Sequence, residues 1–592
     1  MGEMLRYQNT LKDLPIPNLN DTLDKYLKWV EPILSKDEFE ETKNIVKEFG
    51  KENGEGEKLH KKLLQYRGNI EGNKSWLFPM WDELYLEGRY SIVPAISYCG
   101  LLNNDKYRDE STLEEILSKV AYTTTEIYNQ IVEGNFPVDM IKDSPLCMEQ
   151  YLRVFKSMRI PNTNIDKYHV GELSTKNNHC IIFNNNNIYK LLLSDANGNI
   201  VSQGELLKSI EYITNQSITN EYNPFIYTCT DRDRAKSILD NVLVSEGNSR
   251  NFEDIKNALF VICIDNTNKS SKDTVYDLLI SNGDNRCFDK SLQFVINQNK
   301  EIGLSIEHTG FDGSTVFGLL KIINDELDKN NKISKYEGDV KLPELLKFDL
   351  TDNLKLLLNE LKEEQLKNLE DYYLNLHYFN DFGSNKIKEL KVSPDAYFHI
   401  AVQLAQYKTF GKIRSTYESV AVKNFRQGRT ECARPSSLEK LEFAKAFVEN
   451  EYSKEKIYEL LQNASSEHTS RIRECQMGMG VERHLFGLLK MQERFKDELN
   501  MHEKPALYKD KGYKELKTDF ISTSGVGGEY TRYCAFGPQV DNGFGMFYTM
   551  NKNNIVINLA SKMSEKDEAD KFVNNLVLAF NEIKSFIENF NK

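Results

Sequence analysis

The chain has 592 residues, of which 40% are hydrophobic and 28% are charged, and its formal net charge is −13 at pH 7. This length exceeds what one ordinary hydrophobic core organises, so two or more domains are expected. The negative charge, with no basic face evident along the chain, argues against a nucleic-acid partner.

The first part of the chain is predicted to be helical and irregular up to about residue 160. Leu23, Leu27, Val30 and Ile33 recur at three- and four-residue steps, which is typical of a helix. Beyond Pro161, the segment CIIFNNNNIYKLLLSDANGNIV alternates apolar runs with Asn-rich turns and predicts strands joined as hairpins. The short apolar run NALFVICIDN predicts a central buried strand.

A second hairpin is predicted where LQFVI and IGLSIEH are joined by NQNKE. In its second strand Ile302, Leu304, Ile306 and His308 share one face, because side chains alternate along a strand. Four residues after His308 comes Asp312, then a glycine. Such a histidine suits a general base. The alternative is a core histidine bonded to the backbone, the commoner situation for an isolated motif of this kind.

The charged stretch from Asp325 to Glu370 predicts a connector with an amphipathic helix. We place a domain boundary near residue 350, which divides the chain into residues 1–350 and 351–592. Ser393 and Pro394 predict the start of the helix DAYFHIAVQLAQYKTF, which should end at Gly411.

A last helix is predicted near the C-terminus. Ser564 and Asp567 resemble a capping box at its start. Its apolar stripe consists of Phe572, Leu576, Ala579, Phe580, Ile583 and Ile587. The mixture of segregated helices and strands predicts mixed α/β or α+β layers.

Nine cysteines are scattered along the sequence, and none is spaced as C-x-x-C. This pattern suits a reducing compartment, and we predict no structural zinc and no other metal site. The start MGEMLRYQNTLKDLPIPNL lacks the features of a signal or transit peptide. No run approaches the ~18 apolar residues of a membrane span. We therefore expect a cytoplasmic protein without an integral membrane segment.

Eight segments, taken in order, resemble the motifs of a known family. They are LPIPNLNDTLDKYLKWVEPIL, PLCMEQYLRVFKSMRIP, NRCFDKSLQFVI, EHTGFDG, SPDAYFHIAVQLAQYK, TYESVAVKNFRQGRTE, GVERHLFGL, and STSGVGGEY with the later FGPQVDNGFG. From near Leu14 onward the chain thereby resembles the carnitine/choline acyltransferase family. The resemblance implies two similar α/β domains, each a mixed sheet with flanking helices, and an active-site tunnel between them. It also implies a monomer without a permanent cofactor, with acyl-CoA and carnitine as substrates.

By this resemblance His308 is the catalytic histidine, Asp312 the acid of its motif, and Ser524 the serine that stabilises the oxyanion. A positioned imidazole can take the proton of an alcohol as it attacks a thioester, so no acyl-enzyme is required. A hydroxyl donor aimed at the resulting oxyanion stabilises the transition state. Without the resemblance, Asp312 could equally cap a turn and Ser524 could belong to a polar loop.

Three further positions favour carnitine as the acceptor. Arg483 stands where carnitine enzymes carry arginine, and a guanidinium matches the carboxylate that carnitine has and choline lacks. Thr430 and Tyr417 also match the carnitine type, whereas Cys432 departs from the usual threonine or asparagine. Choline or another amino alcohol is the alternative acceptor. Read without the resemblance, the three would be a paired arginine, a loop threonine and a packed tyrosine.

For CoA, the resemblance points to Lys388, Asp395 and Ser419, with Lys386 compensating for the serine that replaces a second lysine. Lysines hold phosphates as mobile point charges. The alternatives are a solvated charge run for the lysines and structural roles for Asp395 and Ser419. Gly525 replaces the usual glutamine, Cys287 replaces a tryptophan and Ser384 replaces the second lysine. These three changes make a non-catalytic CoA-binding or scaffold homologue the alternative.

Cys534 occupies the position that sets acyl chain length. Short-chain members of the family carry methionine there and longer-chain members carry glycine. A cysteine of intermediate size leaves room for several methylenes, each worth ~0.8 kcal/mol when buried. We therefore expect transfer of a short or medium acyl chain.

Overall fold

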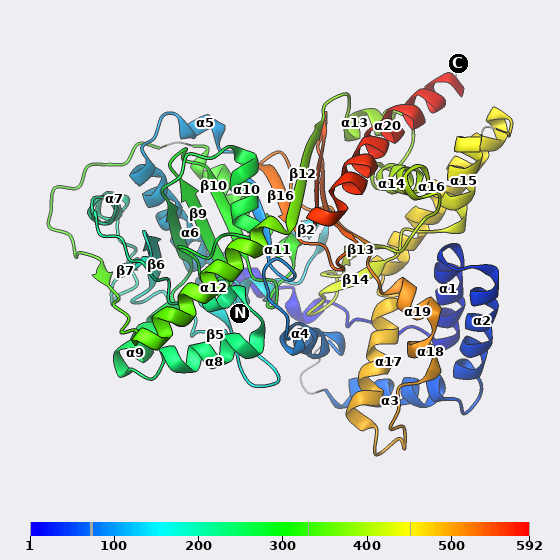
Figure 1. The fold of residues 1–592 in the computed structure, drawn as a ribbon, viewed down its shortest axis with the longest axis horizontal. Helices are drawn as coiled ribbons and strands as arrows, with labels where there is room; N and C mark the ends of the chain where they lie inside the picture. Colours follow the sequence, from blue (N-terminus) through cyan, green and yellow to red (C-terminus); the bar gives the residue numbers. More distant parts are fainter. Residues whose placement is uncertain (1, 71–74, 330, 450, 591–592) are drawn as a thin grey trace. The chain divides into compact units, whose positions relative to one another are not determined.

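The computed structural model describes residues 2–70, 75–329, 331–449 and 451–590. The chain forms two compact units, and each unit is assembled from three stretches of sequence (Figure 1). The first unit comprises Met1–Thr10, Asp82–Tyr372 and Val526–Gly537, and the second comprises Leu11–Trp81, Tyr373–Gly525 and Pro538–Lys592.

Packing of the N-terminal helices explains why the units are not two contiguous halves separated near residue 350. Helices α1 (Leu19–Val30), α2 (Lys36–Gly50) and α3 (Glu55–Asn69) lie in the second unit. There they pack against helices from late in the chain: α17 (Glu482–Phe495), α18 (Ala506–Lys509) and α19 (Lys511–Leu516). A periodicity of apolar residues identifies such helices, but it does not identify what they pack against.

The first unit is built on an eight-stranded mixed sheet in the order β11-β7-β6-β8-β9-β10-β1-β16. Strand β8 is parallel to both of its neighbours, and the other neighbouring pairs of this sheet are antiparallel. The strands are β1 (Tyr98–Leu102), β6 (His179–Asn184), β7 (Asn187–Leu192), β8 (Val261–Asp265), β9 (Leu292–Asn297), β10 (Ile302–Ile306), β11 (Glu344–Leu345) and β16 (Thr531–Phe536).

Both predicted hairpins and the predicted central strand are confirmed. Strands β6 and β7 pair antiparallel, as do β9 and β10, and β8 lies between β6 and β9. Strand β1 was missed, because its sequence YCGLL is a short, fully buried run within a region expected to be helical or irregular. Such a run shows no alternation that would distinguish a strand from a helix.

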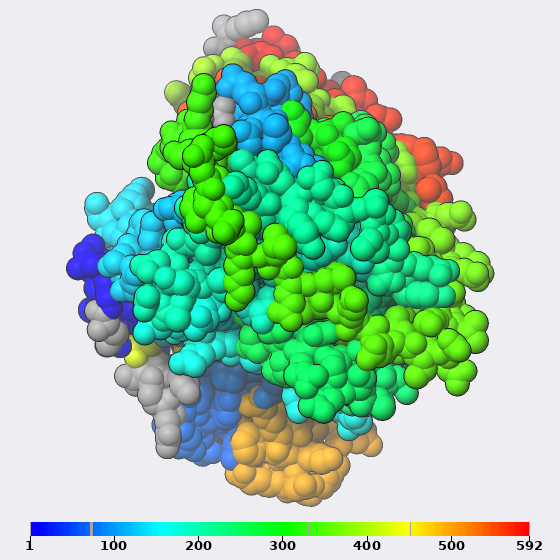
Figure 2. Space-filling view, turned by 90° about the vertical axis from the view of Figure 1, so that its left-hand side faces the viewer, coloured from blue at the N-terminus to red at the C-terminus, as the bar shows by residue number. Residues whose placement is uncertain are grey.

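Helices flank this sheet; among them, α10 packs on β1, β10 and β16 (Figure 1). The helices of the first unit are α4 (Leu77–Glu87, shared with the second), α5 (Asp105–Arg108), α6 (Leu113–Glu133), α7 (Gln203–Thr214), α8 (Arg232–Val242), α9 (Glu246–Asn257), α10 (Ser271–Leu279), α11 (Gly313–Leu327) and α12 (Asp352–Glu370). Small two-stranded sheets are formed by β2 (Met140–Ile141) with β3 (Ser144–Pro145) and by β4 (Ser157–Ile160) with β5 (Lys167–Val170). The connector at 331–351 runs over the outside of this unit (Figure 2).

The second unit is built on a six-stranded mixed sheet in the order β12-β18-β17-β15-β13-β14. Strand β15 is parallel to both β13 and β17, whereas β13 pairs antiparallel with β14. The strands are β12 (Tyr372–Phe379), β13 (Thr416–Ala421), β14 (Thr430–Ala433), β15 (Ile521–Ser524), β17 (Phe544–Met550) and β18 (Ile555–Lys562). The protein is therefore a mixed α/β fold with two mixed sheets and flanking helices, as expected.

Both predicted helices of the second unit are present. Helix α14 (Pro394–Phe410) ends where Gly411 adopts φ +68°, a left-handed conformation that suits glycine. Helix α20 (Lys566–Phe590) packs against α14, and its predicted stripe is buried. The predicted capping box is wrong, because Ser564 lies inside a 3-10 turn and its hydroxyl bonds to Glu565. The remaining helices are α13 (Ser384–Glu389), α15 (Leu438–Glu449) and α16 (Lys454–Gln476).

All nine cysteines are buried, and among the described residues none forms a disulfide. Among the described residues, none of the helices combines the length and the hydropathy needed to cross a membrane.

Candidate active site

His308 lies in the loop between β10 and α11 in the first unit, two residues beyond the end of the strand. Its ring is half-buried, although the neighbouring residues on both sides are buried. His308 Nδ1 is 2.9 Å from the carbonyl oxygen of Phe311. Since a carbonyl oxygen can only accept, Nδ1 carries the proton of the neutral ring and Nε2 is the basic nitrogen.

The residues flanking His308 fix its backbone. The carboxylate of Glu307 accepts hydrogen bonds from the backbone amide of Thr309 at 3.2 Å and from its hydroxyl at 2.5 Å. These bonds close a short turn around His308, while Tyr85 and Tyr98 lie beside the ring at centroid distances of 5.3 and 4.9 Å. The backbone bond expected for a core histidine is therefore present, and it also gives the ring the tautomer of a base.

Gly310 permits the close packing of this loop. A Cβ atom at position 310 would lie 2.1 Å from the hydroxyl oxygen of Tyr168. That hydroxyl donates to the carbonyl of Arg153 at 3.1 Å and also lies 3.1 Å from the hydroxyl of Ser291. The glycine that follows the histidine and threonine is thus required by a neighbouring side chain.

Asp312 is buried at the first position before α11, but its side chain makes no capping bond. Instead, Gln150 Nε2 donates to Asp312 Oδ2 at 2.9 Å, and the Asp312 amide donates back to Gln150 Oε1 at 2.8 Å. Gln150 belongs to the PLCMEQY segment, so two of the sequence motifs meet here.

A buried ionic network lies behind the histidine loop. Asp166 Oδ2 accepts from Arg159 Nε at 2.7 Å and from Arg232 Nε at 2.6 Å, and all three side chains are fully buried. Arg232 also pairs with Asp289 at 2.7 Å. Burial opposes the ionisation of Asp166, but Arg232 and Arg159 outweigh it and lower its pKa. Arg159 Nη1 reaches within 3.9 Å of Glu307, which links the network to the loop.

In the second unit, the parallel pair β13 and β15 brings several predicted residues onto one face. The register places Tyr417 opposite Ser522 and Glu418 opposite Thr523. Because side chains alternate, Tyr417, Ser419 and Ser524 share one face of the sheet, and Glu418 lies on the other. Ser524 is the last residue of β15 and is half-buried.

Arg483, Tyr417 and Thr430 are brought together around one guanidinium. Arg483 donates through Nε to the Thr430 carbonyl at 2.9 Å and through Nη2 to the Tyr417 hydroxyl at 3.1 Å and the Thr430 hydroxyl at 3.4 Å. Each hydroxyl that accepts from Arg483 keeps its own hydrogen to donate. The guanidinium lies 3.9 Å from the centre of the Trp81 ring. This arrangement can present several donors to an anion.

The charges around Arg483 leave it a partly uncompensated cation. Glu482 Oε1 lies 3.3 Å from Arg483 Nη1 but also accepts from Lys517 at 2.6 Å, and Glu482 Oε2 accepts from Arg434 Nε at 2.7 Å. Burial opposes the ionisation of Glu482, yet these cations hold its pKa well below the usual range. Glu431 is different, because burial raises its pKa to about 7.

The predicted CoA residues also lie in the second unit, on α13, at the start of α14 and on β13. Lys386 is bonded to Glu588 at 3.0 Å and to Glu389 at 3.2 Å. For the exposed Lys388, no carboxylate of the described chain lies within ion-pair distance. The carboxylate of Asp395 accepts from the Tyr548 hydroxyl at 3.0 Å and lies 2.9 Å from His468 Nε2.

Gly525 stands where glutamine was expected, and its environment explains the change. A Cβ atom at this position would lie 2.5 Å from the ring of Tyr548. The aromatic ring thus fills the space that a side chain at 525 would need.

Cys534 lies in β16 of the first unit, opposite Gly100 of β1. The thiol is fully buried, and a Cβ atom at position 100 would lie 3.7 Å from its sulfur. Phe317 of α11 approaches the same point at 3.4 Å. Cys534 therefore lies beside Gly100 and Phe317 in the interior of the first unit.

Some contributors could not be identified from sequence. Trp81 is separated from Arg483 by about 400 residues, and no pattern around it indicates a contact with an arginine. Glu307 precedes His308 in the chain, and the alternation along the strand assigned it no role in the site. Its role in the turn follows from the geometry of the loop that begins after Ile306.

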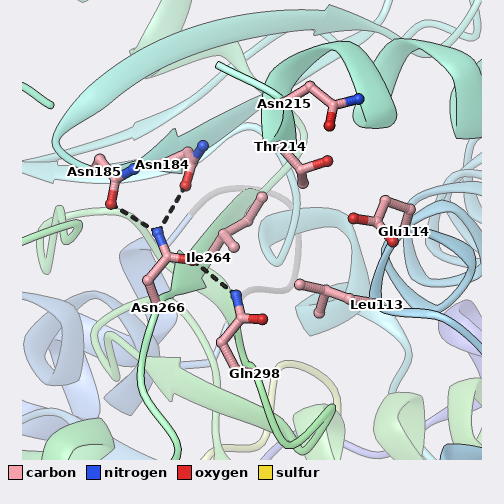
Figure 3. Close-up of a pocket in the computed structure, with 9 residues that line it drawn as sticks. All are labelled: Leu113, Glu114, Asn184, Asn185, Thr214, Asn215, Ile264, Asn266 and Gln298. Atoms are coloured by element: carbon pink, nitrogen blue, oxygen red, sulfur yellow. Dashed lines mark hydrogen bonds between the residues drawn. The ribbon is translucent and has the colours of Figure 1, made fainter. Parts of the chain in front are cut away.

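A hollow elsewhere in the first unit is a poor candidate for the site. Its volume is about 450 Å³, and it is lined mainly by amides, with Asn266 donating to Asn185 at 2.7 Å and to Asn184 at 3.2 Å (Figure 3). Among the described residues that line it, Glu114 is the only ionisable one, and none is a predicted site residue. These residues therefore do not form an acid and base pair.

Comparisons with known proteins agree with the sequence motifs. A family model described as choline/carnitine O-acyltransferase matches residues 14–577. Among curated relatives, carnitine O-acetyltransferase of Columba livia is 29% identical over 92% of this chain and 88% of that protein. Choline O-acetyltransferase of Danio rerio is 28% identical over 96% and 91%. Mitochondrial carnitine O-palmitoyltransferase 2 of Macaca fascicularis is 28% identical over 94% and 89%.

Proposed function

Since the chain belongs to the choline/carnitine O-acyltransferase family, we propose that it transfers a short or medium acyl chain reversibly between coenzyme A and the hydroxyl of carnitine. The observation that carries the proposal is the bond from His308 Nδ1 to the Phe311 carbonyl. It makes Nε2 the basic nitrogen of a half-buried imidazole, which is the state a general base needs.

In the proposed mechanism the carnitine hydroxyl attacks the thioester carbonyl carbon while His308 Nε2 accepts its proton. The new C–O bond leaves an oxyanion, to which Ser524 donates a hydrogen bond. As the C–S bond breaks, the imidazolium returns the proton to the sulfur, so that CoA leaves as a thiol. Asp312, held by Gln150, helps to fix the start of α11 behind the histidine loop. The nine buried thiols take no part.

Carnitine is the proposed acceptor because the Arg483 cluster suits a carboxylate. Tyr417 and Thr430 each accept from Arg483 and can donate to an anion. Three cations, on Arg434, Lys517 and Arg483, lie around the carboxylate of Glu482. The guanidinium of Arg483 favours a zwitterion with a carboxylate over choline, which is only cationic.

For CoA we propose Lys388 as the main phosphate contact, because Lys386 already has two carboxylate partners. Lys386, Ser419 and Asp395 would be further contacts, and Cys534 would bound the acyl chain. We propose a monomer that acts in the cytoplasm on these small molecules, since the described cysteines form no disulfide and the charge does not suit nucleic acid.

The direct test is the release of CoA from acetyl-CoA in the presence of L-carnitine. We expect His308→Ala to lower kcat by about 10²–10⁴-fold. The exposed His502 provides a matched control, and His502→Ala should retain the wild-type rate. Equal rates for wild type and His308→Ala would overturn the catalytic assignment. No release by wild type would instead favour a non-catalytic homologue.

A further inference from the structure

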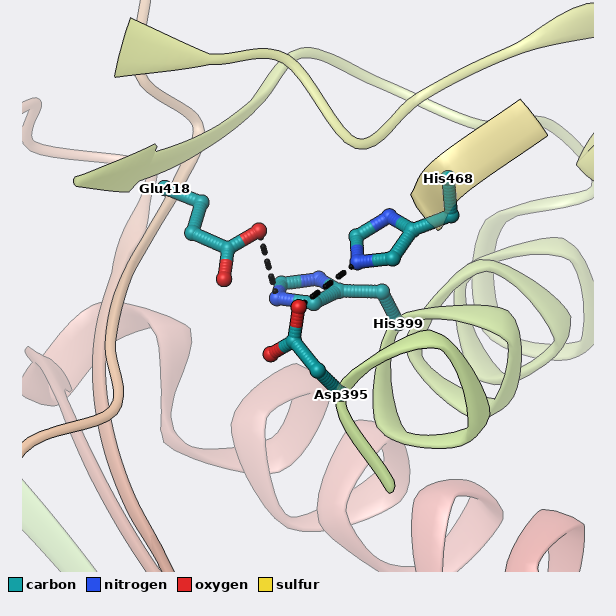
Figure 4. A group of neighbouring side chains, drawn as sticks. All are labelled: Asp395, His399, Glu418 and His468. Carbon is teal, nitrogen blue, oxygen red and sulfur yellow. Dashed lines mark hydrogen bonds and ion pairs between the residues drawn. The ribbon is translucent and has the colours of Figure 1, made fainter. Parts of the chain in front are cut away.

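Four ionisable side chains converge in the second unit, three of them buried and one, Asp395, partly exposed, and we call them the buried quartet. Asp395 and His399 come from α14, Glu418 from β13 and His468 from α16. Asp395 and His399 are one helical turn apart and so project from the same side of α14. Figure 4 shows the four groups turned toward a common centre.

The distances within the quartet are those of a preformed ligand set. His399 Nε2 is 3.0 Å from Glu418 Oε2, and His468 Nε2 is 2.9 Å from Asp395 Oδ2. One coordinating atom from each residue lies within 4.8 Å of the other three. Donors that share an ion at about 2.0–2.2 Å are separated by comparable distances, so small side-chain movements would suffice.

Several of these atoms lack a hydrogen bond. His399 is fully buried, and neither of its ring nitrogens makes a hydrogen bond to the described residues. The same holds for Glu418 Oε2, because its contact with His399 does not have hydrogen-bond geometry. Buried polar atoms are almost always bonded, since leaving them unsatisfied is costly. The unsatisfied nitrogens of His399 and the Oε2 atom of Glu418 therefore require an additional binding partner.

The charges point to a cation. Two carboxylates meet here, and the Tyr548 hydroxyl reaches both, at 3.0 Å from Asp395 Oδ1 and 3.4 Å from Glu418 Oε1. The buried ammonium of Lys440 is bonded to Glu467 at 2.8 Å. The imidazole nitrogens of His399 and His468 complete the set of possible donors.

We propose that the buried quartet binds one divalent transition-metal ion of the zinc class, through His399, His468, Asp395 and Glu418. Two imidazoles and two carboxylates suit such an ion better than Mg²⁺ or Ca²⁺, which prefer oxygen donors alone. Four protein ligands fill a tetrahedral sphere, as in structural rather than catalytic sites. The cysteine spacing that argued against zinc has no bearing on these donors.

The ion would connect α14, α16 and β13 behind the face that carries Tyr417 and Ser419. Glu418 lies between these two residues in β13, on the opposite face. Metal binding would thus stabilise the strand on which substrate contacts are proposed. The site itself does not depend on the proposed acyl transfer, because metal content and unfolding can be measured without substrate.

The experiment uses the full chain, stripped with a chelator and titrated with Co²⁺ and Zn²⁺. We expect one ion per chain, ligand-field absorption of tetrahedral Co²⁺ without thiolate charge-transfer bands, and a rise in the unfolding temperature with Zn²⁺. His399→Gln and His468→Asn should each weaken Co²⁺ binding by about 100-fold or more. His502→Asn, at an exposed histidine, is the matched control and should bind as wild type does.

Binding that is unchanged in both quartet variants would overturn the proposal, as would thiolate bands in the Co²⁺ spectrum. If a variant does not fold, the metal content and the unfolding temperature of the wild-type protein test the proposal. A wild-type protein that takes up no stoichiometric ion and shows no Zn²⁺-dependent shift in unfolding temperature would also contradict it.

Discussion

The histidine loop of the first unit and the Arg483 cluster of the second unit are organised in different ways. His308 is oriented by a backbone carbonyl three residues away and by a turn that its two neighbours close. Arg483 is held by side chains from distant segments, including Trp81, Tyr417 and Thr430. Local contacts in the histidine loop therefore determine which nitrogen of His308 is basic. Contacts between distant segments position the guanidinium of Arg483. The first should govern turnover and the second the binding of the acceptor.

The largest expected effect is a loss of stability when the buried ionic network behind the histidine loop is disrupted. Removing one partner of a buried ion pair leaves charges uncompensated, so Asp166→Ala should lower the free energy of unfolding by about 3–5 kcal/mol. Urea unfolding followed by circular dichroism measures it. The control is Asp233. Arg89 pairs with both Asp166 and Asp233, but the Asp233 side chain is 69% exposed. Asp233→Ala should therefore change the free energy of unfolding by less than ~1 kcal/mol. Equal losses of stability in Asp166→Ala and Asp233→Ala would mean that the buried network does not contribute more than an exposed ion pair.

The next effect tests the dispersed cluster. Arg483→Ala should raise the KM for carnitine by about 100-fold, because charge-assisted hydrogen bonds are lost, with a smaller change in kcat. Steady-state kinetics with acetyl-CoA and carnitine give both constants. Arg473→Ala, at an exposed arginine of α16, is the control and should leave KM unchanged. An unchanged KM in Arg483→Ala would favour choline or another amino alcohol as acceptor.

A third prediction concerns the pH dependence of stability and applies to Glu431, which lies beside Arg483 in the second unit. Burial raises the pKa of Glu431 from 4.5 to about 7, so the folded state keeps a proton that the unfolded chain releases. Between those values the free energy of unfolding should fall as pH rises, by roughly 3 kcal/mol at most. Urea midpoints at pH 5 and pH 8 test this. Glu431→Gln should remove the decline, and Glu451→Gln, at an exposed residue, should retain it. A flat wild-type profile would contradict the interpretation.

The smallest expected effect concerns chain length. Cys534→Met adds bulk beside Gly100 and Phe317, where we propose that the acyl chain ends. Since each buried methylene is worth ~0.8 kcal/mol, octanoyl-CoA should lose about 3–10-fold in kcat/KM relative to acetyl-CoA. A panel of acyl-CoA donors measures the ratio. A parallel loss with both donors would mean that residue 534 does not bound the chain.

Local patterns predicted local structure well. Alternation around His308 identified the β9–β10 hairpin, and Ser393 with Gly411 bounded α14. The motifs also pointed to Tyr417, Thr430 and Arg483, which the structure brings together. Contacts across hundreds of residues were beyond reach, since neither the stacking of Trp81 nor the burial of His468 leaves a periodic signal. Asp395 and His399 have helical spacing, but their partners Glu418 and His468 lie on other elements.

The ring of Tyr548 has an evolutionary consequence. Because it occupies the space beside Gly525 and also donates to Asp395, positions 525 and 548 cannot change independently. Grafting the glutamine of other family members into this chain would need a smaller residue at 548, and that exchange would deprive the aspartate of its hydroxyl donor. The two positions should therefore show epistasis: each single swap is deleterious, and only a coordinated pair is tolerated.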